Sequence, residues 1–467
     1  MSNGKGRGIG RRRFFRSASA LAAGALTAHC GVTGRASRAP GSRKRLATFA
    51  CDVTLPLGTP IYSSYEPLKT IEHPLLAKGV VIEENDTRYV VCAVDWCQLR
   101  NSTYDTFRRK VACAAETSEA HVAVQTVHQH TAPISDADVW PFLDTVETPP
   151  PYPPAEVFDS AAAVLGEAIR HSLDGLKPFD RVGTGSARVE RIASNRRIPA
   201  GDGKVGFRAS SCRNERLCAL PEGLIDPVLQ TITFAQGERP LARLHYYATH
   251  PQSFYGDPRA SYDFVGMARE RLEDEEGVFQ VYFTGCAGDV AAGKYNDGTP
   301  EARQRLYERL YAAMAESSGA TRFVSAPTIE WTNADFPLTT RQDEGYTKED
   351  NRTAMADPER RDSSRSGAAM ALTYRARAAR PIELSAMHLG NVHVVHLPGE
   401  PMVEFQLFAK KLRKRDFVAV AGYGDCCVGY ICPARAYEEG GYEPTASNLR
   451  PESEGPFRAA IGESLRV

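Results

Sequence analysis

Short apolar runs recur along the chain and predict eight β-strands. They lie at 79–83, 89–94, 121–126, 230–234, 241–248, 279–284, 382–389 and 391–397. Most are rich in β-branched or aromatic residues, the composition that favours strands. Four longer stretches repeat their apolar residues at helical spacing, at 103–115, 155–173, 266–275 and 300–317. Ser102 is the residue we expect to cap the first of these helices. Strands alternating with helices predict a layered α/β domain with mixed β-sheet.

The pattern shows no second domain after the N-terminal segment. Hydrophobic residues make up 42% of the 467-residue chain, enough for one large core or two modest ones. The segment 341–380 is strongly charged, and its second half has helical spacing. We interpret this segment as a charged helical excursion on the surface. Residues 46–467 are therefore predicted to form one catalytic domain.

The first 45 residues differ sharply in charge from the rest. They hold 11 of the 57 basic residues and no acidic residue. Arg11-Arg12-Arg13-Phe14-Phe15 fits a twin-arginine export pattern, and a short apolar run follows at 18–28. That run is too short to span a bilayer as a stable helix. We expect a twin-arginine signal and basic leader at 1–45, with export to the periplasm or the extracellular space. The alternative is a disordered basic tail.

Export through the twin-arginine route is directly testable. Replacing both Arg11 and Arg12 with lysine should leave the precursor in the cytoplasm, because this route reads the arginine pair rather than its charge. Cell fractionation and immunoblotting measure the distribution. The matched control is Arg16→Lys, which lies outside the pair and should leave export intact. Normal export of the double variant would refute the prediction.

Without the leader, the chain carries a clear excess of acidic residues. The remainder has 46 basic against 57 acidic residues, a net charge of about −11. A protein this acidic is a poor partner for nucleic acids, and we expect none. We also expect no transmembrane segment in the mature chain.

Eleven cysteines are many for a cytoplasmic protein and acceptable for an exported one. Their spacing shows no paired CxxC pattern of the kind that holds structural zinc. Cys212 and Cys218 flank a short polar loop and are candidates for a disulfide. Other pairings stay open.

The candidate chemistry begins with two histidines. His128 and His130 follow the apolar run 122–126 at alternate positions, and Pro133 comes soon after. Residues i and i+2 of a strand point to the same side, so both imidazoles should face one pocket. Such a pair is a natural start for a metal site. The alternative is a pair of buried, hydrogen-bonded histidines.

Further polar residues follow other apolar runs. His250 comes after 241–248, and Glu400 comes after 391–397; a proline follows each. In α/β folds, strand ends converge on the functional crevice. Two histidines and a carboxylate suit zinc and leave a position open for water. Small residues at 285–292 allow two interpretations, a tight strand-to-helix turn or a close backbone approach to a ligand.

These motifs together resemble the catalytic domain of neutral/alkaline, non-lysosomal ceramidases, over about 47–460. Residues 127–133 are similar to the family motif Thr-His-Thr-His-Ser-x-Pro, and 397–400 reads Leu-Pro-Gly-Glu as the family does. Residues 249–253 approximate the motif around the family's other histidine, and 195–199 its Asn-Arg-Ser-Pro motif. The family's tyrosine spacing is kept by Tyr430, Tyr437 and Tyr442.

The resemblance implies a site and an activity. It implies a single zinc with four ligands: His128, His250, Glu400 and Tyr430. It places three catalytic residues around the reacting carbonyl: His130, Arg196 and Tyr442. The implied enzyme is an exported zinc-dependent amidohydrolase that cleaves an N-acyl amide with water activated by the zinc. Its expected partner is a small-molecule or lipid amide, with a ceramide-like lipid and peripheral membrane contact left open.

Two departures from the family pattern bear on the mechanism and the substrate. Ala291 stands where the family has the serine proposed as its nucleophile. The resemblance also stops short of the family's C-terminal immunoglobulin-like domain, so we leave ceramide itself open as the substrate. One alternative is a noncatalytic zinc-containing binding protein that has lost its nucleophile, which Ala291 favours. The presence of His130 beside the ligand set favours an enzyme. An esterase of the same fold, or an enzyme acting on sugar-linked amides, is a third interpretation.

Overall fold

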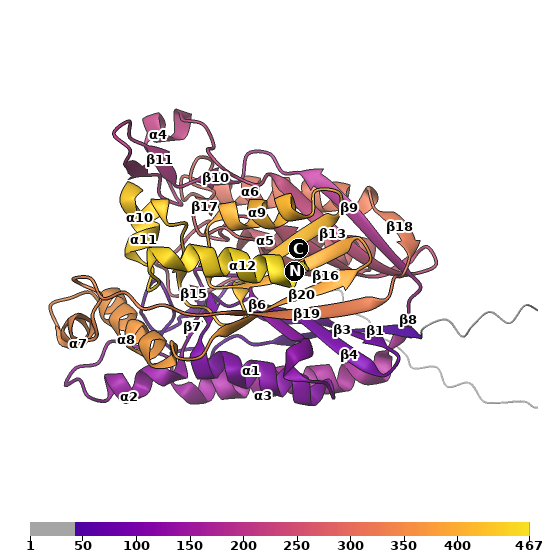
Figure 1. The fold of residues 1–467 in the computed structure, drawn as a ribbon, viewed down its shortest axis with the longest axis horizontal. Helices are drawn as coiled ribbons and strands as arrows, with labels where there is room; N and C mark the ends of the chain where they lie inside the picture. Colours follow the sequence, from indigo (N-terminus) through magenta and orange to yellow (C-terminus); the bar gives the residue numbers. More distant parts are fainter. Residues whose placement is uncertain (1–42, 467) are drawn as a thin grey trace, which may run out of the picture. The chain divides into compact units, whose positions relative to one another are not determined.

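The computed structural model describes residues 43–466, which belong to one compact unit. The arginine pair and apolar run of the predicted signal lie outside the described residues, whereas Lys44 and Arg45, the end of the predicted leader 1–45, already belong to the first strand of the domain. Two sheets dominate the fold (Figure 1). The larger is mixed and has nine strands, in the order β19 (Ile329–Phe336), β20 (Ile382–Leu389), β21 (Val392–Pro398), β23 (Phe417–Gly424), β6 (Val122–Thr126), β4 (Thr87–Val94), β3 (Leu76–Glu84), β1 (Lys44–Asp52), β8 (Lys177–Pro178). The smaller has five, in the order β16 (Phe279–Thr284), β14 (Arg239–Tyr247), β13 (Val228–Gln236), β9 (Arg181–Arg188), β18 (Arg322–Ser325).

The nine-stranded sheet separates two hydrophobic cores because its side chains alternate between its faces. Val90 and Cys92 of β4 enter the first core, whereas Val91 and Ala93 enter the second. The first core lies under helices that include α1 (Asn101–Ala114), α3 (Ala155–Ser172), α9 (Val403–Leu412) and α12 (Glu454–Ser464). The second core contains the five-stranded sheet with α5 (Asp263–Glu276) and α6 (Pro300–Gly319). The result is a layered α/β fold with helices outside both sheets (Figure 1).

Loops beyond the strand ends are joined by five two-stranded pairs. These are β2 (Thr70–Ile71) with β15 (Arg259–Ala260), β5 (Gln98–Leu99) with β7 (Ile134–Ser135), β10 (Ser194–Asn195) with β17 (Val290–Ala291), β11 (Arg197–Pro199) with β12 (Val205–Phe207), and β22 (Glu400–Pro401) with β24 (Tyr430–Ile431). The remaining short helices are α2 (Trp140–Leu143), α4 (Glu215–Ala219), α10 (Arg435–Glu439) and α11 (Tyr442–Thr445). Three of these pairs, β5–β7, β10–β17 and β22–β24, carry residues of the candidate site.

The predicted fold class is confirmed, and all eight predicted strands are present, those at 279–284 and 382–389 with the predicted bounds and the other six with shifted ends. In the two large sheets the pattern missed the strands β1, β8, β9, β18, β19 and β23. In β9 and β19 exposed polar or glycine positions interrupt the apolar ones, so neither strand forms an apolar run. The predicted cap of α1 is wrong. Arg100 is the N-cap, and the Ser102 hydroxyl instead donates a 2.6 Å hydrogen bond to Asp138.

The segment 341–380 is not a surface excursion throughout. It contains α7 (Lys348–Ala356) and α8 (Asp362–Arg377), and the middle of α8 is buried. The charged residues of α8 gather near its ends, whereas 366–374 is largely small or apolar, and this stretch packs into the first core. The local excess of charge therefore concealed a core helix.

Two further expectations concern the thiols and the membrane. The ten cysteines within 43–466 are all free, so the candidate disulfide is not formed; instead the Cys218 thiol donates to the Cys212 carbonyl at 3.4 Å. Of the helices in the described part of the chain, none is both long and apolar enough to cross a bilayer.

Candidate active site

Three electron-pair donors converge at one buried point. His128 Nε2 and His250 Nε2 lie 3.2 Å apart. Glu400 Oε2 lies 3.2 Å from the first nitrogen and 3.6 Å from the second. All three side chains are at most 5% exposed. These are ligand types that zinc and related ions accept, and their mutual distances allow one ion to contact all three.

Hydrogen bonds fix which imidazole nitrogens carry protons. His128 Nδ1 lies 2.8 Å from the carbonyl oxygen of Cys97, and His250 Nδ1 lies 2.7 Å from that of Ala287. A carbonyl oxygen only accepts, so each Nδ1 is the donor, and each neutral Nε2 presents a lone pair. Two lone pairs facing each other at 3.2 Å, beside a carboxylate oxygen without a hydrogen bond of its own, fit a cation between them. The donor set therefore fits a metal ion.

His128 reaches this point by a different route from the predicted one. Strand β6 ends at Thr126, and His128 has φ = +72°, in the left-handed region. The strand alternation on which the prediction rested does not extend to the histidines. Their ring centroids still lie 5.0 Å apart, because the sharp backbone turn at His128 brings both rings to the same place. A non-glycine residue at positive φ is strained, which is common at ligand-binding positions.

The small-residue stretch 285–292 supports both other donors. The carbonyls of Ala287 and Val290 accept from His250 Nδ1, and Val290 also accepts from the His250 backbone N–H at 3.0 Å. A Cβ at Gly288 would lie only 2.5 Å from the Glu400 carbonyl oxygen. The stretch is therefore a close backbone approach, and the groups it approaches are His250 and Glu400.

Sequence reasoning missed two residues of the site. Gln98 Nε2 donates to Glu400 Oε1 at 2.5 Å, which leaves Oε2 facing the histidines. The Tyr423 ring stacks on His128 with centroids 4.1 Å apart. The signal for Gln98 was present, because it follows the apolar run of β4 just as His128 follows that of β6. Gln98 was not predicted as a site residue because an amide neither titrates nor binds zinc strongly.

The other predicted residues surround the same point. Tyr430 pairs in register with Glu400 in β22–β24, and its hydroxyl accepts from Arg196 Nη2 at 3.2 Å. Arg196 Nε forms a 3.2 Å ion pair with Glu443. The Tyr442 ring stands edge-on to Tyr430 at 5.6 Å and is 46% exposed. The structure thus gathers all seven predicted site residues around one place.

Burial sets the protonation of the histidines. Burial, with Arg196 nearby, lowers the pKa of His250 to about 4. Burial and the neighbouring His128 lower the pKa of His130 well below its usual value. Gln252 Nε2 lies 3.1 Å from His130 Nδ1, whereas the buried His130 Nε2 has no hydrogen-bond partner within the described residues. His130 is therefore a neutral imidazole with one ring nitrogen uncommitted.

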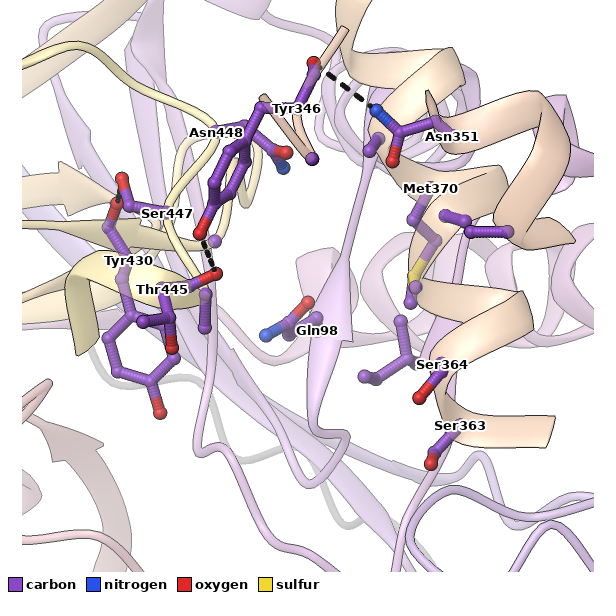
Figure 2. Close-up of a pocket in the computed structure, with 18 of the residues that line it drawn as sticks. Gln98, Tyr346, Asn351, Ser363, Ser364, Met370, Tyr430, Thr445, Ser447 and Asn448 are labelled. Atoms are coloured by element: carbon purple, nitrogen blue, oxygen red, sulfur yellow. Dashed lines mark hydrogen bonds between the residues drawn. The ribbon is translucent and has the colours of Figure 1, made fainter. Parts of the chain in front are cut away.

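The site opens into a cavity of about 570 Å³ that includes Glu400 and Tyr430 in its lining. Figure 2 shows Ser363, Ser364 and Met370 of α8 on one wall and Tyr430, Thr445, Ser447 and Asn448 on the other. Part of the charged segment 341–380 therefore forms one wall of the cavity.

Comparisons with known proteins identify the fold. No family model and no curated protein matches the chain. A solved structure of a ceramidase complexed with C2 has a TM-score of 0.67 and 16% identity, covering 91% of this chain and 76% of its own. The neutral ceramidase from Pseudomonas aeruginosa gives a TM-score of 0.64 and 13% identity, covering 91% and 75%. The fold is therefore neutral ceramidase-like, as the sequence motifs predicted.

Proposed function

We propose that this chain, which has a neutral ceramidase-like fold, is a zinc-dependent hydrolase of linear N-acyl amides. The observation that carries the proposal is the convergence of two imidazole lone pairs and a free carboxylate oxygen at a buried point. Zinc bound there would polarise the amide carbonyl and activate water for attack on it. The likeness to the two ceramidase structures supports the choice of an amide as substrate.

The proposed ligands are His128, His250, Glu400 and Tyr430. The hydrogen bonds described above orient the donor atoms of the first three. Tyr430 is proposed as the fourth because it pairs with Glu400 across β22–β24. Burial raises the pKa of the Tyr430 phenol well above its usual value, and the Arg196 guanidinium, which donates to the Tyr430 oxygen, acts against that rise. Carbonyl and amide partners behind each histidine and behind Glu400 hold the ligands in orientation.

The proposed catalytic residues are His130, Arg196 and Tyr442. His130 is the group for proton transfer, because its imidazole lies beside His128 and its Nε2 is not held in a hydrogen bond with the protein. The Tyr442 hydroxyl is proposed to orient the substrate or stabilise the oxyanion that forms during attack. The Arg196 guanidinium lies 5.7 Å from the ring centres of both Tyr430 and Tyr442, so its charge acts on the same region.

Ala291 rules out a serine nucleophile at its position. Its methyl group cannot form an acyl-enzyme. The hydroxyl of Ser194, paired with Ala291 across β10–β17, donates to the Ala291 carbonyl at 2.9 Å and accepts from the Lys294 N–H. That hydroxyl is held in a structural hydrogen bond and is not a substitute. Water is therefore the proposed nucleophile.

A substrate panel tests the proposal. Purified protein of known zinc content is offered N-acyl amides, N-acyl sugars and matched esters, and release of the fatty acid is measured. Hydrolysis of an amide is expected without Ala291→Ser, and mass spectrometry should find no acyl-enzyme accumulating. An inert native protein whose Ala291→Ser variant is active would overturn the water mechanism and favour the binding-protein alternative. Cleavage of esters alone would indicate an esterase.

We also propose that the enzyme works outside the cytoplasm. The proposal rests on Arg11, Arg12 and the apolar run at 18–28, which lie outside the described residues. Twin-arginine export carries folded proteins, so an enzyme with its metal already in place is compatible with this route. Contact with a membrane surface would be peripheral.

A further inference from the structure

Arg100 is a buried charge that forms no ion pair with another residue of the described chain, although the charges of Asp136 and Glu400 act on it. Its side chain is 7% exposed, and its Nε donates to Gln98 Oε1 at 2.6 Å. Within residues 43–466, its two Nη groups make no hydrogen bond and no ion pair. A buried guanidinium normally has its charge paired and most of its donors used. Arg100 leaves four N–H bonds unused, and it lines the cavity of the active site.

Asp136 is a buried carboxylate whose charge acts on Arg100, but it forms no ion pair with it. Asp136 accepts hydrogen bonds from the Asn101 amide at 2.9 Å, the Thr373 hydroxyl at 2.6 Å and the Asp138 N–H at 3.2 Å. It makes none with Arg100, so its oxygens stabilise the start of α1 and its contact with α8. The Arg100 charge is left for something that enters the cavity.

Arg100 lies next to the proposed metal ligands. Gln98 joins them, because its amide nitrogen donates to Glu400 and its amide oxygen accepts from Arg100. On the other side, a Cβ at Gly429, the neighbour of Tyr430, would lie 3.6 Å from Arg100 Nη2. Two hydrogen bonds therefore separate the guanidinium from Glu400. A group bound by Arg100 would lie in the same cavity as Glu400.

The charge and polarity of the cavity agree with an anionic occupant. Its charged lining, taken over the described residues, consists of Arg100, Arg360, Arg361 and Glu400. Glu400 is already assigned to the metal, so the cavity is positive with or without the ion. Polar groups such as Ser363, Ser364 and Asn448 line the walls (Figure 2). A neutral two-chain lipid would leave these groups and Arg100 without partners, at a cost in binding free energy.

We propose that the substrate is an N-acyl amide with a carboxylate within a few bonds of the scissile amide, and that Arg100 binds this carboxylate through its Nη groups. This inference rests on the proposed amide hydrolysis. The planar guanidinium matches a carboxylate by two parallel hydrogen bonds. N-acyl amino acids carry the carboxylate on the amine half, and amides of short dicarboxylic acids carry it on the acyl half. Both place it within a few bonds of the scissile amide.

The test compares substrates that differ only in charge. N-lauroylglycine and N-lauroylglycinamide are offered to the native protein, and laurate release gives kcat/KM for each. N-lauroylethanolamine and an N-succinyl alkylamine, followed by amine release, show which half carries the carboxylate. We expect the native protein to favour lauroylglycine over its amide by roughly 10- to 100-fold, the worth of hydrogen bonds to a charged group. Arg100→Gln should reduce this ratio to near one, and Arg100→Lys should retain part of it.

Controls separate a binding role from a positioning role. Arg109→Gln, the same change at an exposed residue of the same helix, should keep the native ratio. If Arg100 serves only to orient Gln98, Arg100→Gln will slow both substrates equally and leave the ratio unchanged, which would overturn the proposal. A carboxylate that binds the metal alone would likewise keep its preference in Arg100→Gln. Zinc content and circular dichroism of each variant exclude loss of the site or the fold.

A binding measurement distinguishes failure of this inference from failure of the proposed activity. Calorimetric titration with lauroylglycine and lauroylglycinamide needs no turnover. A preference for the acid that Arg100→Gln abolishes would support the anion subsite even in a protein that hydrolyses neither compound. The hydrolase would be sustained and the subsite overturned if both compounds are hydrolysed at equal rates, the N-succinyl alkylamine is not favoured over a neutral amide, and Arg100→Gln changes neither ratio.

Discussion

The variants His128→Ala and His250→Ala will each fail to retain zinc that the native protein holds at about one ion per chain. Each substitution removes one of three converging donors and leaves the other two buried without a partner. Loss of affinity should exceed the roughly 10- to 100-fold that removal of an outer partner costs a metal site. Dialysis against a weak chelator, followed by elemental analysis, measures the retained metal.

Two further variants make this result specific. His171→Ala, at an exposed histidine on α3, should retain zinc fully. Gln98→Ala removes the amide that holds Glu400 and should weaken zinc binding without abolishing it. Circular dichroism checks that the ligand variants are folded. Stoichiometric zinc in both His128→Ala and His250→Ala would mean that the metal, if one is bound, lies elsewhere.

The variant His130→Ala should keep its zinc and lose roughly 10²- to 10⁴-fold in kcat/KM, the usual contribution of a group that transfers protons. His130 lies beside His128 but is not one of the three converging donors, so its loss should spare the metal. Paired metal analysis and kinetics on the best substrate of the panel measure the two effects.

A second set of possible ligands in the structure offers an alternative metal site. Cys97, His128 and His130 also offer donor atoms within 4.8 Å of one another. If zinc is lost from His130→Ala and kept by His250→Ala, the metal is bound by this group instead. The Cys97 sulfur lies 3.6 Å from His128 Nδ1, which is the nitrogen that donates to the Cys97 carbonyl and so has no lone pair to offer on that side. The group of His128, His250 and Glu400 is therefore the more favourable site.

The sequence predicted the layers of the fold because strands and helices alternate along it. It predicted that the site residues converge because they follow the ends of apolar strands. His250 and Glu400 follow apolar runs, and the structure brings their side chains together as that pattern indicated. His128 was placed correctly for a partly wrong reason. Its φ of +72° depends on contacts made after folding, including the hydrogen bond from its N–H to the Trp96 carbonyl. Alternation along a strand cannot foresee such a turn.

Other features stayed hidden because they depend on partners distant in sequence. Gln98 meets Glu400 across 302 positions, and Asn101 meets Thr373 across 272. The burial of α8 was obscured by the arginines and aspartates around it, since a local window averages them with the apolar middle of the helix. The unused donors of Arg100 are likewise visible only when its surroundings are known.

The spacing of the three donors along the chain gives the proposed metal a second role, as a cross-link. His128 and His250 are 122 positions apart, and His128 and Glu400 come shortly after β6 and β21. An ion that joins them closes two very long loops, and binding to the folded chain alone adds RT ln(1 + [L]/Kd) to its stability. The melting temperature of the enzyme would then rise with the concentration of free zinc. The supply of zinc where the chain folds would determine how much enzyme persists as well as how much is active.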